Sequence, residues 1–330
     1  MAATDMIELW RGGMRESVHA GHAVVCDARG QIVDAWGDPE AVIFPRSSCK
    51  MLQALPLIES GAAARAGLTD AHLALACASH QGATMHTSAV ASWLSTLGLG
   101  ETDLRCGAHM PYDEPERDRL ICAHERPCQL HNNCSGKHAG FLTLNQHLKG
   151  GAEYVEVDHP LQRAVRSAFE EVTGEASPAH GIDGCSAPNF ATSVHGLARA
   201  MSVFATAGEG GTTRERAAHR LTRAMAAFPE LVAGEGRACT ALMRAMGGKV
   251  AVKTGAEAVF VAILPEQKLG VALKILDGAT RASEAAITAL LVRLGVLDKG
   301  HPVVGRYLTG TQRNWRGLAT GELRLAPGFC

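Results

Sequence analysis

The pattern of apolar positions predicts β-structure near both ends of the chain. Apolar runs at 18–26 and 31–36 flank a turn at 27–30 that contains Gly30, and this arrangement predicts a β-hairpin. Three further apolar runs predict strands in the last third of the chain, at 249–253, 258–264 and 269–276. An amphipathic helix is predicted to follow them.

Between these strand regions the apolar positions recur with a helical period. Five such segments predict helices, at 88–97, 138–148, 161–172, 190–207 and 214–228. This order brings both ends of the chain into one antiparallel sheet and leaves the middle as a second lobe. We therefore predict one α+β domain in which helices flank the sheet, with a sheet lobe at about 1–67 and 235–330. The mostly helical lobe would span about 68–234, with the site in the cleft between the lobes.

Composition narrows the possible partners. The chain has 330 residues, 46% of them hydrophobic and 20% charged, and a formal net charge of −1. No excess of positive charge favours nucleic acid or a membrane surface as a partner. No basic segment followed by an apolar run marks an export signal, so we expect a cytoplasmic protein whose ten cysteines are mostly buried thiols.

A serine and two lysines occur in an order that indicates acyl-transfer chemistry. Ser47 and Lys50 form an S-x-x-K motif at the start of a predicted helix, where positions i and i+3 share a face. A neutral Lys50 amine there takes the proton of the Ser47 hydroxyl. Lys253 opens a Lys-Thr-Gly motif whose apolar flanks place it on a buried strand.

Further motifs make the pattern specific. Beside Arg46–Lys50 and Lys253–Glu257, the chain carries Ala78-Ser79-His80-Gln81-Gly82, Cys106-Gly107-Ala108-His109-Met110-Pro111, the segment 131–138 and the segment 181–189. In matching order, from about residue 18 to 276, these six motifs resemble the bacterial L-asparaginase family of the Rhizobium etli type (asparaginase II). The layout is also similar to that of serine β-lactamases, penicillin-binding proteins and serine-dependent glutaminases.

The resemblance implies a serine β-lactamase-like fold, a homodimer, and hydrolysis of L-asparagine to L-aspartate and ammonia. It implies two serine–lysine pairs, Ser47 with Lys50 and Ser79 with Lys253. It also implies one zinc ion (Zn2+) per chain, whose ligands are Cys134, Lys137 and Cys185.

The residue types alone suggest another ligand set. Thiolate and imidazole are the usual zinc ligands, and Cys134, His138 and Cys185 would supply them. The resemblance favours Lys137 over His138, which remains a candidate for supporting the ligands, as does Asp183. A cluster of Cys122, Cys128 and Cys134 is a further alternative, but these residues do not share a helical face.

The remaining candidates concern substrate and transition state. Arg46 is placed to pair with a substrate carboxylate and His80 to hydrogen-bond the substrate. By analogy with the β-lactamase layout, the backbone N–H groups of Ser47 and Ala256 would stabilise the oxyanion. Ser47 would attack the carboxamide and form an acyl-enzyme.

Rival functions remain at this point. The same residues are compatible with a serine-dependent glutaminase, a penicillin-recognising acylase, a zinc-hydroxide amidohydrolase or a zinc-dependent binding protein. One methylene in a pocket is worth only about 1–3 kcal/mol, so the sequence does not separate asparagine from glutamine. The tail after residue 294 suggests no function.

Overall fold

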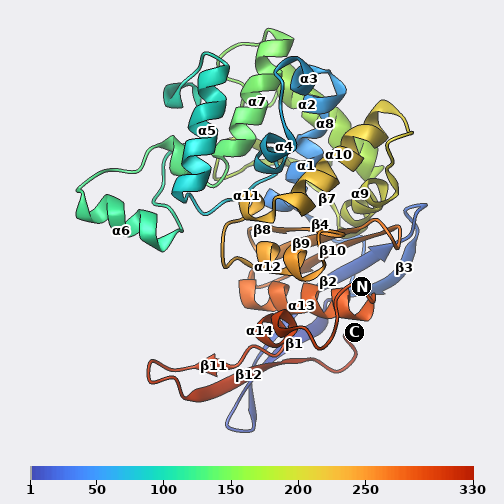
Figure 1. The fold of residues 1–330 in the computed structure, drawn as a ribbon. Coiled ribbons are helices and arrows are strands. Elements are labelled where there is room, and N and C mark those ends of the chain that lie inside the picture. The colour runs from blue at the N-terminus through green and yellow to red at the C-terminus, as the bar shows by residue number, and fades with distance from the viewer. Residues whose placement is uncertain (1) are drawn as a thin grey trace. The chain divides into compact units, whose positions relative to one another are not determined.

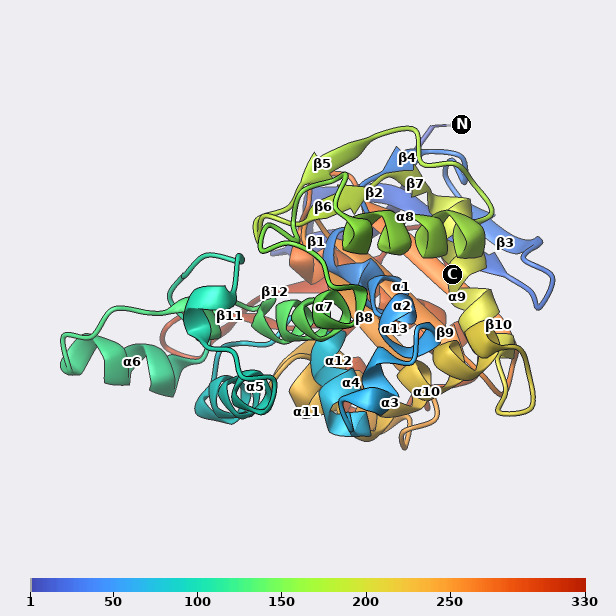
Figure 2. The same cartoon turned by 90° about the horizontal axis from the view of Figure 1, so that it is seen from above.

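The computed structural model describes residues 2–330, which form two compact units. The first, here called the sheet unit, runs up to Ser48 and also contains Thr192–Thr206 and Ala241–Cys330. The second, here called the helical unit, contains Cys49–Ala191 and Ala207–Thr240. Figure 1 shows the elements of each unit along the chain, and Figure 2 shows them from above.

One antiparallel sheet dominates the sheet unit. Its strands follow the order β11-β12-β1-β2-β10-β9-β8, and β3 pairs with β2. Their bounds are β1 Thr4–Arg11, β2 Met14–Cys26, β3 Ile32–Trp36, β8 Ala251–Gly255, β9 Val259–Leu264, β10 Leu269–Ile275, β11 Gln312–Arg313 and β12 Ala319–Leu325. A short pair joins β4 (Val42–Ile43) to β7 (Thr192–Ser193).

Helices cover the central strands of this sheet. All six residues of β9 are buried, so both faces of this strand are covered. Helices α9 (Val194–Thr206) and α13 (Thr280–Arg293) both pack on β9 and β10, and α14 (Pro302–Tyr307) packs on α13. The strand β10 lies between β2 and β9, and it thereby joins the first and last thirds of the chain.

The predicted fold class, an antiparallel sheet flanked by helices with a mostly helical second part, is confirmed. So are the hairpin, now β2–β3, and the three later strands β8, β9 and β10. The sequence did not predict β1 and β12, which pair with each other so that Ile7 lies opposite Leu325. Each strand is stabilised by its pairing with the other, which is a contact between the two ends of the chain.

The helical unit is built around α7 (Ser135–Leu148), of which residues 135–145 are all buried. The other helices are α1 Lys50–Gln53, α2 Leu55–Glu59, α3 Ala62–Arg65, α4 Asp70–Ala76, α5 Thr84–Thr96, α6 Glu114–Cys122, α8 Pro160–Thr173, α10 Thr213–Ala227 and α11 Pro229–Val232. Helix α12 (Ala238–Ala245) spans the boundary between the units. Short 3-10 helices are η1 Arg46–Cys49, η2 Glu101–Asp103 and η3 Gln129–His131, and β5 (His180–Ile182) pairs with β6 (Pro188–Phe190).

The observed units differ from the predicted lobes in two stretches. Residues 49–67 belong to the helical unit, because α1, α2 and α3 pack on α7, α8 and α10. Helix α9 belongs to the sheet unit, because it packs on β2, β9 and β10. The helix predicted after Ser47 is broken at Ala54 into α1 and α2, with Pro56 in the first turn of α2.

Most cysteines are buried free thiols, as predicted. Seven of the ten are buried, Cys122 and Cys330 are exposed, and Cys128 is half-buried. Within residues 2–330, no helix is both long and apolar enough to cross a bilayer.

A close approach between α4 and α7 gives a test of this packing. A Cβ built on Gly136 would lie 2.4 Å from the Leu75 carbonyl oxygen. Gly136→Ala should therefore lower the free energy of unfolding by about 1–3 kcal/mol in urea titrations. The exposed Gly151, whose Cβ would meet nothing within 4 Å, is the control, and Gly151→Ala should change stability by less than about 1 kcal/mol. Equal stability of the two variants would contradict this packing.

Candidate active site

The S-x-x-K motif begins in a tight turn. The backbone N–H and the hydroxyl of Ser48 both donate to the Pro45 carbonyl oxygen, at 3.2 and 2.7 Å. Arg46 between them has a φ of 53°, an uncommon value for a residue with a side chain. Ser48 is buried and its hydroxyl is used within the turn, whereas Ser47 is half-exposed. Ser47 is thus the more accessible serine of this pair.

The Lys-Thr-Gly strand packs directly on this turn, within the sheet unit. A Cβ on Gly255 would lie 2.6 Å from the Pro45 carbonyl oxygen and 3.0 Å from the Ser48 nitrogen, so a larger residue would displace the strand. Lys253 is buried and its Nζ donates to the Thr254 carbonyl at 2.7 Å. The glycine of the motif therefore allows β8 to lie against the start of the S-x-x-K segment.

Lys50 connects three segments of the helical unit. Its Nζ donates to the Ala78 carbonyl oxygen, to Ser79 Oγ at 3.1 Å and to Cys134 Sγ at 3.1 Å. The side chain is buried. Lys50 therefore contacts Ser79. The pairs implied by the resemblance were Ser47 with Lys50 and Ser79 with Lys253, so this contact was not among them.

Hydrogen bonds hold the loop that carries Ser79. The Ser79 N–H donates to the Val232 carbonyl at 2.8 Å, and the His80 N–H donates to the Asn133 carbonyl at 3.2 Å. His80 Nδ1 accepts from the Gly82 N–H at 3.1 Å, so the other ring nitrogen donates to Ser135 Oγ at 2.9 Å. Both ring nitrogens are bonded inside the protein, and neither is left for the substrate contact predicted for His80.

Cys134, Lys137 and Cys185 come together. Cys134 immediately precedes α7, Lys137 lies in its first turn, and Cys185 lies in the turn between β5 and β6. Lys137 Nζ lies 2.9 Å from Cys185 Sγ, and all three side chains are buried. The structure thus gathers the three residues that the family resemblance implies as ligands.

Cys134, Lys137 and Cys185 shift one another's pKa values. A hydrogen bond from the Cys134 thiol, and then the charge of Lys137, hold the pKa of Cys185 well below its ordinary value despite its burial. The pKa of Cys134 is raised well above its ordinary value, because its thiol donates that bond and is buried. Burial alone would lower the pKa of Lys137, but the charge of Cys185 and the hydrogen bond to its sulfur outweigh burial and raise the pKa. The group therefore comprises a thiolate, a thiol and an ammonium.

These donors fit zinc in type. Two sulfurs and one nitrogen match the ligands that zinc takes in proteins, although Cys134 and Lys137 must each release a proton on binding. Among residues 2–330, no three His, Cys, Asp or Glu side chains are grouped so that they could hold a metal ion. Cys134, His138 and Cys185 are accordingly not grouped as metal ligands within the described part of the chain.

His138 lies beside the group in another role. Its Nδ1 bonds to the Tyr154 hydroxyl at 2.9 Å, and its ring also interacts with Cys185, which contributes to the lowered pKa of that thiol. Burial lowers the pKa of His138 to about 4, so the ring is neutral. Its position agrees with a supporting rather than a ligating residue.

The other predicted residues take up turn positions. Asp183 Oδ1 accepts the Gly184 N–H at 2.9 Å, so this carboxylate shapes the turn that presents Cys185. Ala256 is the exposed residue that follows β8, at the start of the β8–β9 turn. Arg46 is half-exposed in the turn before Ser47.

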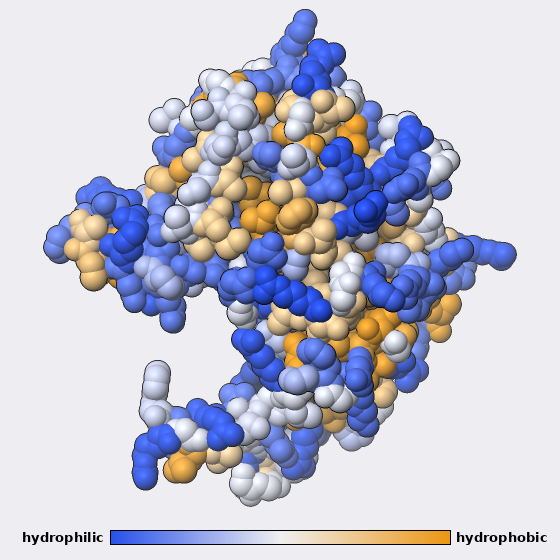
Figure 3. Space-filling view, viewed as in Figure 1, coloured by the Kyte–Doolittle hydropathy of each residue, from blue (hydrophilic) through white to orange (hydrophobic). Residues whose placement is uncertain are grey.

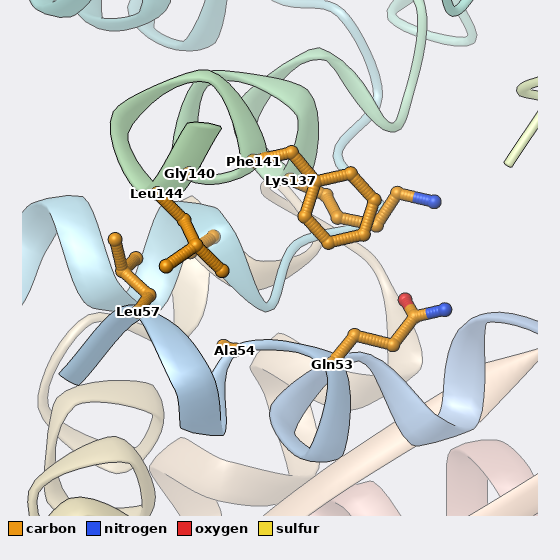
Figure 4. A pocket seen from close by; sticks show the side chains of 8 residues that line it. Gln53, Ala54, Leu57, Lys137, Gly140, Phe141 and Leu144 are labelled. Carbon is orange, nitrogen blue, oxygen red and sulfur yellow. The ribbon is translucent and has the colours of Figure 1, made fainter. Parts of the chain in front are cut away.

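A small cavity of about 10 Å³ adjoins Lys137 (Figure 4). Apart from Gln53 and Lys137, its lining is apolar, from Ala54, Leu57, Ala76, Gly140, Phe141 and Leu144. The Lys137 ammonium lies 5.2 Å from the centre of the Phe141 ring. A cavity of this size holds about one water molecule, so it is not a substrate pocket.

The sequence missed two contributors to the site. The Ala78 carbonyl accepts from Lys50, and Tyr154 holds the His138 ring. Tyr154 belongs to no motif, and Ala78, although it opens the 78–82 motif, contributes a backbone carbonyl that has no chemical signature in the sequence.

A family model described as L-asparaginase II matches residues 7–325. No curated protein matches the chain. Solved structures that resemble it include Mglu in its tris and glutamate form, with 12% identity and a TM-score of 0.48, covering 84% of this chain and 59% of that one. They also include a β-lactamase from Mycobacterium bovis, with 12% identity and a TM-score of 0.45, covering 84% of this chain and 95% of that one.

The match to the family model extends over nearly the whole chain, and it includes every residue of the candidate site. At their low identities the structural matches add nothing to it. The family assignment supports an amide hydrolase, and this chain belongs to the L-asparaginase II family.

Proposed function

We propose that the protein hydrolyses L-asparagine to L-aspartate and ammonia through an acyl-enzyme on Ser47, as in the Rhizobium etli type of the family. The observation that carries this proposal is the position of Lys50. Lys50 lies three residues after Ser47 in the chain. Its amine contacts Ser79 Oγ and Cys134 Sγ, both at 3.1 Å. A buried amine bonded to a serine hydroxyl is the arrangement that serine–lysine catalysis requires.

In the proposed mechanism each proton has a carrier. The Ser47 hydroxyl attacks the carboxamide carbon, and Lys50 accepts its proton in the neutral form, in which the amine donates to two of its three partners and keeps one lone pair. The proton passes through the Ser79 hydroxyl, which is bonded to Lys50, to the leaving ammonia. Water then hydrolyses the ester by the same route in reverse. The N–H groups of Ser47 and Ala256 stabilise the oxyanion.

The sulfur–lysine group is the proposed zinc site. Cys134, Lys137 and Cys185 would hold the ion, while His138 and Asp183 support it. When bound, zinc supplies a positive charge that orients the amino-acid end of the substrate. Because Cys134 also contacts Lys50, binding at this group fixes one partner of the proposed general base. On the same resemblance we propose a homodimer in the cytoplasm.

The first prediction separates the two adjacent serines. Ser47→Ala should lower kcat for ammonia release from asparagine by at least about 1,000-fold, because it removes the nucleophile. Ser48→Ala is the matched control. It should keep activity and lose about 1 kcal/mol of stability, since its hydroxyl bonds to Pro45. More than about a tenth of the wild-type kcat in Ser47→Ala would contradict the proposal.

Glutamine and a chromogenic β-lactam, assayed beside asparagine, identify the preferred substrate.

The second prediction uses the contact between Lys50 and Ser79. Lys50→Met and Ser79→Ala should each lower kcat/KM by about 100-fold or more, because both residues carry the same proton. The double variant should be little worse than the worse single variant, since groups that act as a unit are not additive. Steady-state kinetics with melting curves for all three variants provide the measurement. Multiplying losses would show that the two residues act separately.

The third prediction concerns zinc and is read by elemental analysis rather than by activity. Wild-type protein should contain one zinc ion per chain, and Cys134→Ser and Cys185→Ser should lose it. Lys137→Ala should also lose the ion, whereas His138→Ala should retain it, because only Lys137 lies among the proposed ligands. Zinc retained in Lys137→Ala but lost in His138→Ala would establish the Cys-His-Cys site instead. Metal-free wild-type protein would remove zinc from the proposal altogether.

A further inference from the structure

A second group of side chains with nucleophilic chemistry lies elsewhere in the helical unit. Cys128 Sγ is 3.3 Å from His131 Nδ1, and His131 Nε2 is 3.4 Å from Glu116 Oε1. A thiol, an imidazole and a carboxylate in this sequence form the nucleophile, base and orienting group of an activated cysteine. None of these three residues takes part in the chemistry proposed above.

The protonation of His131 follows from its hydrogen bonds. The backbone N–H of Cys128 donates to Nδ1 at 3.1 Å, so Nδ1 carries no proton in the neutral ring. Nε2 then bears the proton and donates to Glu116. The unprotonated nitrogen therefore faces the Cys128 thiol, and its lone pair is shared between that thiol and the backbone N–H of the same residue.

Glu116 is fixed as an acceptor. Arg119 donates to Glu116 Oε1 at 2.8 Å, and the Thr84 hydroxyl donates to Oε2 at 3.1 Å. The hydrogen bond from Arg119, followed by those from Thr84 and His131, lowers the pKa of this buried carboxyl despite its burial. Glu116 thus stays ionised and acts through His131 as a positioning residue.

The short helix η3 is held in place as well. The Gln129 N–H donates to Glu101 Oε1 at 2.7 Å, and Gln129 Oε1 accepts the Gly107 N–H at 2.9 Å. Cys128 and His131, at the two ends of this turn, therefore keep their relative positions. Such preorganisation favours proton transfer between them.

Cys128 is also accessible, unlike most thiols of the chain. It is half-buried, whereas burial raises the pKa of the buried thiols Cys26, Cys49 and Cys106 to about 12. The neighbouring helix α6 presents a mainly hydrophilic surface at the left of Figure 3. Cys122 on α6 is more exposed, but no hydrogen bond of its thiol is found within residues 2–330.

We propose that Cys128 is a modification site, a base-activated thiol that forms mixed disulfides with low-molecular-weight disulfides. His131 takes the thiol proton, and Cys128 sulfur attacks one sulfur of the reagent disulfide. A new S–S bond forms while the old one breaks, and the leaving thiolate takes the proton from His131. One disulfide replaces another, so no further oxidant is needed.

The experiment incubates the full-length protein with glutathione disulfide and maps adducts by peptide mass spectrometry. One glutathione should appear on Cys128, before Cys122 reacts, and Cys128→Ser should abolish it. In parallel, site-resolved alkylation by iodoacetamide gives the rate ratio of Cys128 to Cys122 within each molecule. That ratio should exceed one in wild-type protein although Cys122 is more exposed. Preferential adducts on Cys122, or a ratio below one, would overturn the proposal.

Variants of His131 and Glu116 test whether these two residues cause the reactivity of Cys128. His131→Asn should lower the ratio by at least about tenfold, because the base is lost. Glu116→Ala should also lower it, and Glu116→Gln should largely restore it, since the amide oxygen still accepts from Nε2. Cys122 lies on the same helix as Glu116. Local unfolding of this helix would therefore raise the alkylation rate of Cys122, which reveals a variant that is locally unfolded. His131→Gln replaces His131→Asn if that variant unfolds. Unchanged ratios in folded His131 variants would refute activation by His131.

Discussion

A buried lysine is the constraint on which the candidate site depends. Taking an amine out of water is costly unless its hydrogen bonds are replaced. Lys50 replaces them with the Ala78 carbonyl, the Ser79 hydroxyl and the Cys134 sulfur. Ala78 and Ser79 follow α4, and Cys134 immediately precedes α7, so a single Nζ ties two parts of the helical unit together. The same contacts that stabilise the lysine also place it beside a serine hydroxyl and a sulfur.

The sulfur–lysine group shows how buried charges are kept in balance. Lys137 donates to Cys185, which holds the negative charge, while Cys134 keeps its proton and donates to that sulfur. An unpaired buried charge would be strongly destabilising, and each of these groups removes that cost from its neighbour. The arrangement offers two sulfurs and a nitrogen to a cation.

In the sheet unit the corresponding constraint is steric. The turn at Pro45–Ser48 and the end of β8 come so close that only a residue without a Cβ fits at 255. The hydroxyl of Ser48 is consumed inside this turn, which distinguishes it from Ser47 although the two are adjacent and chemically identical. The sequence shows two equivalent serines, but in the structure the Ser48 hydroxyl stabilises the turn and the Ser47 hydroxyl is the accessible one.

The sequence by itself determined the elements whose signals are local. Apolar alternation marked β2, β3, β8, β9 and β10, helical periodicity marked α5, α7, α8, α9 and α10, and the motif spacing named the candidate residues. It missed β12, which pairs with β1 across the whole chain, and it missed β1, although β1 also pairs with β2 through the short turn at 12–13. Only the tertiary structure decided that Lys50 contacts Ser79 and Cys134, that both nitrogens of His80 are used internally, and that His131 links Cys128 to Glu116. These are contacts between side chains, several of them far apart in sequence, and no local propensity encodes the distance between two such atoms.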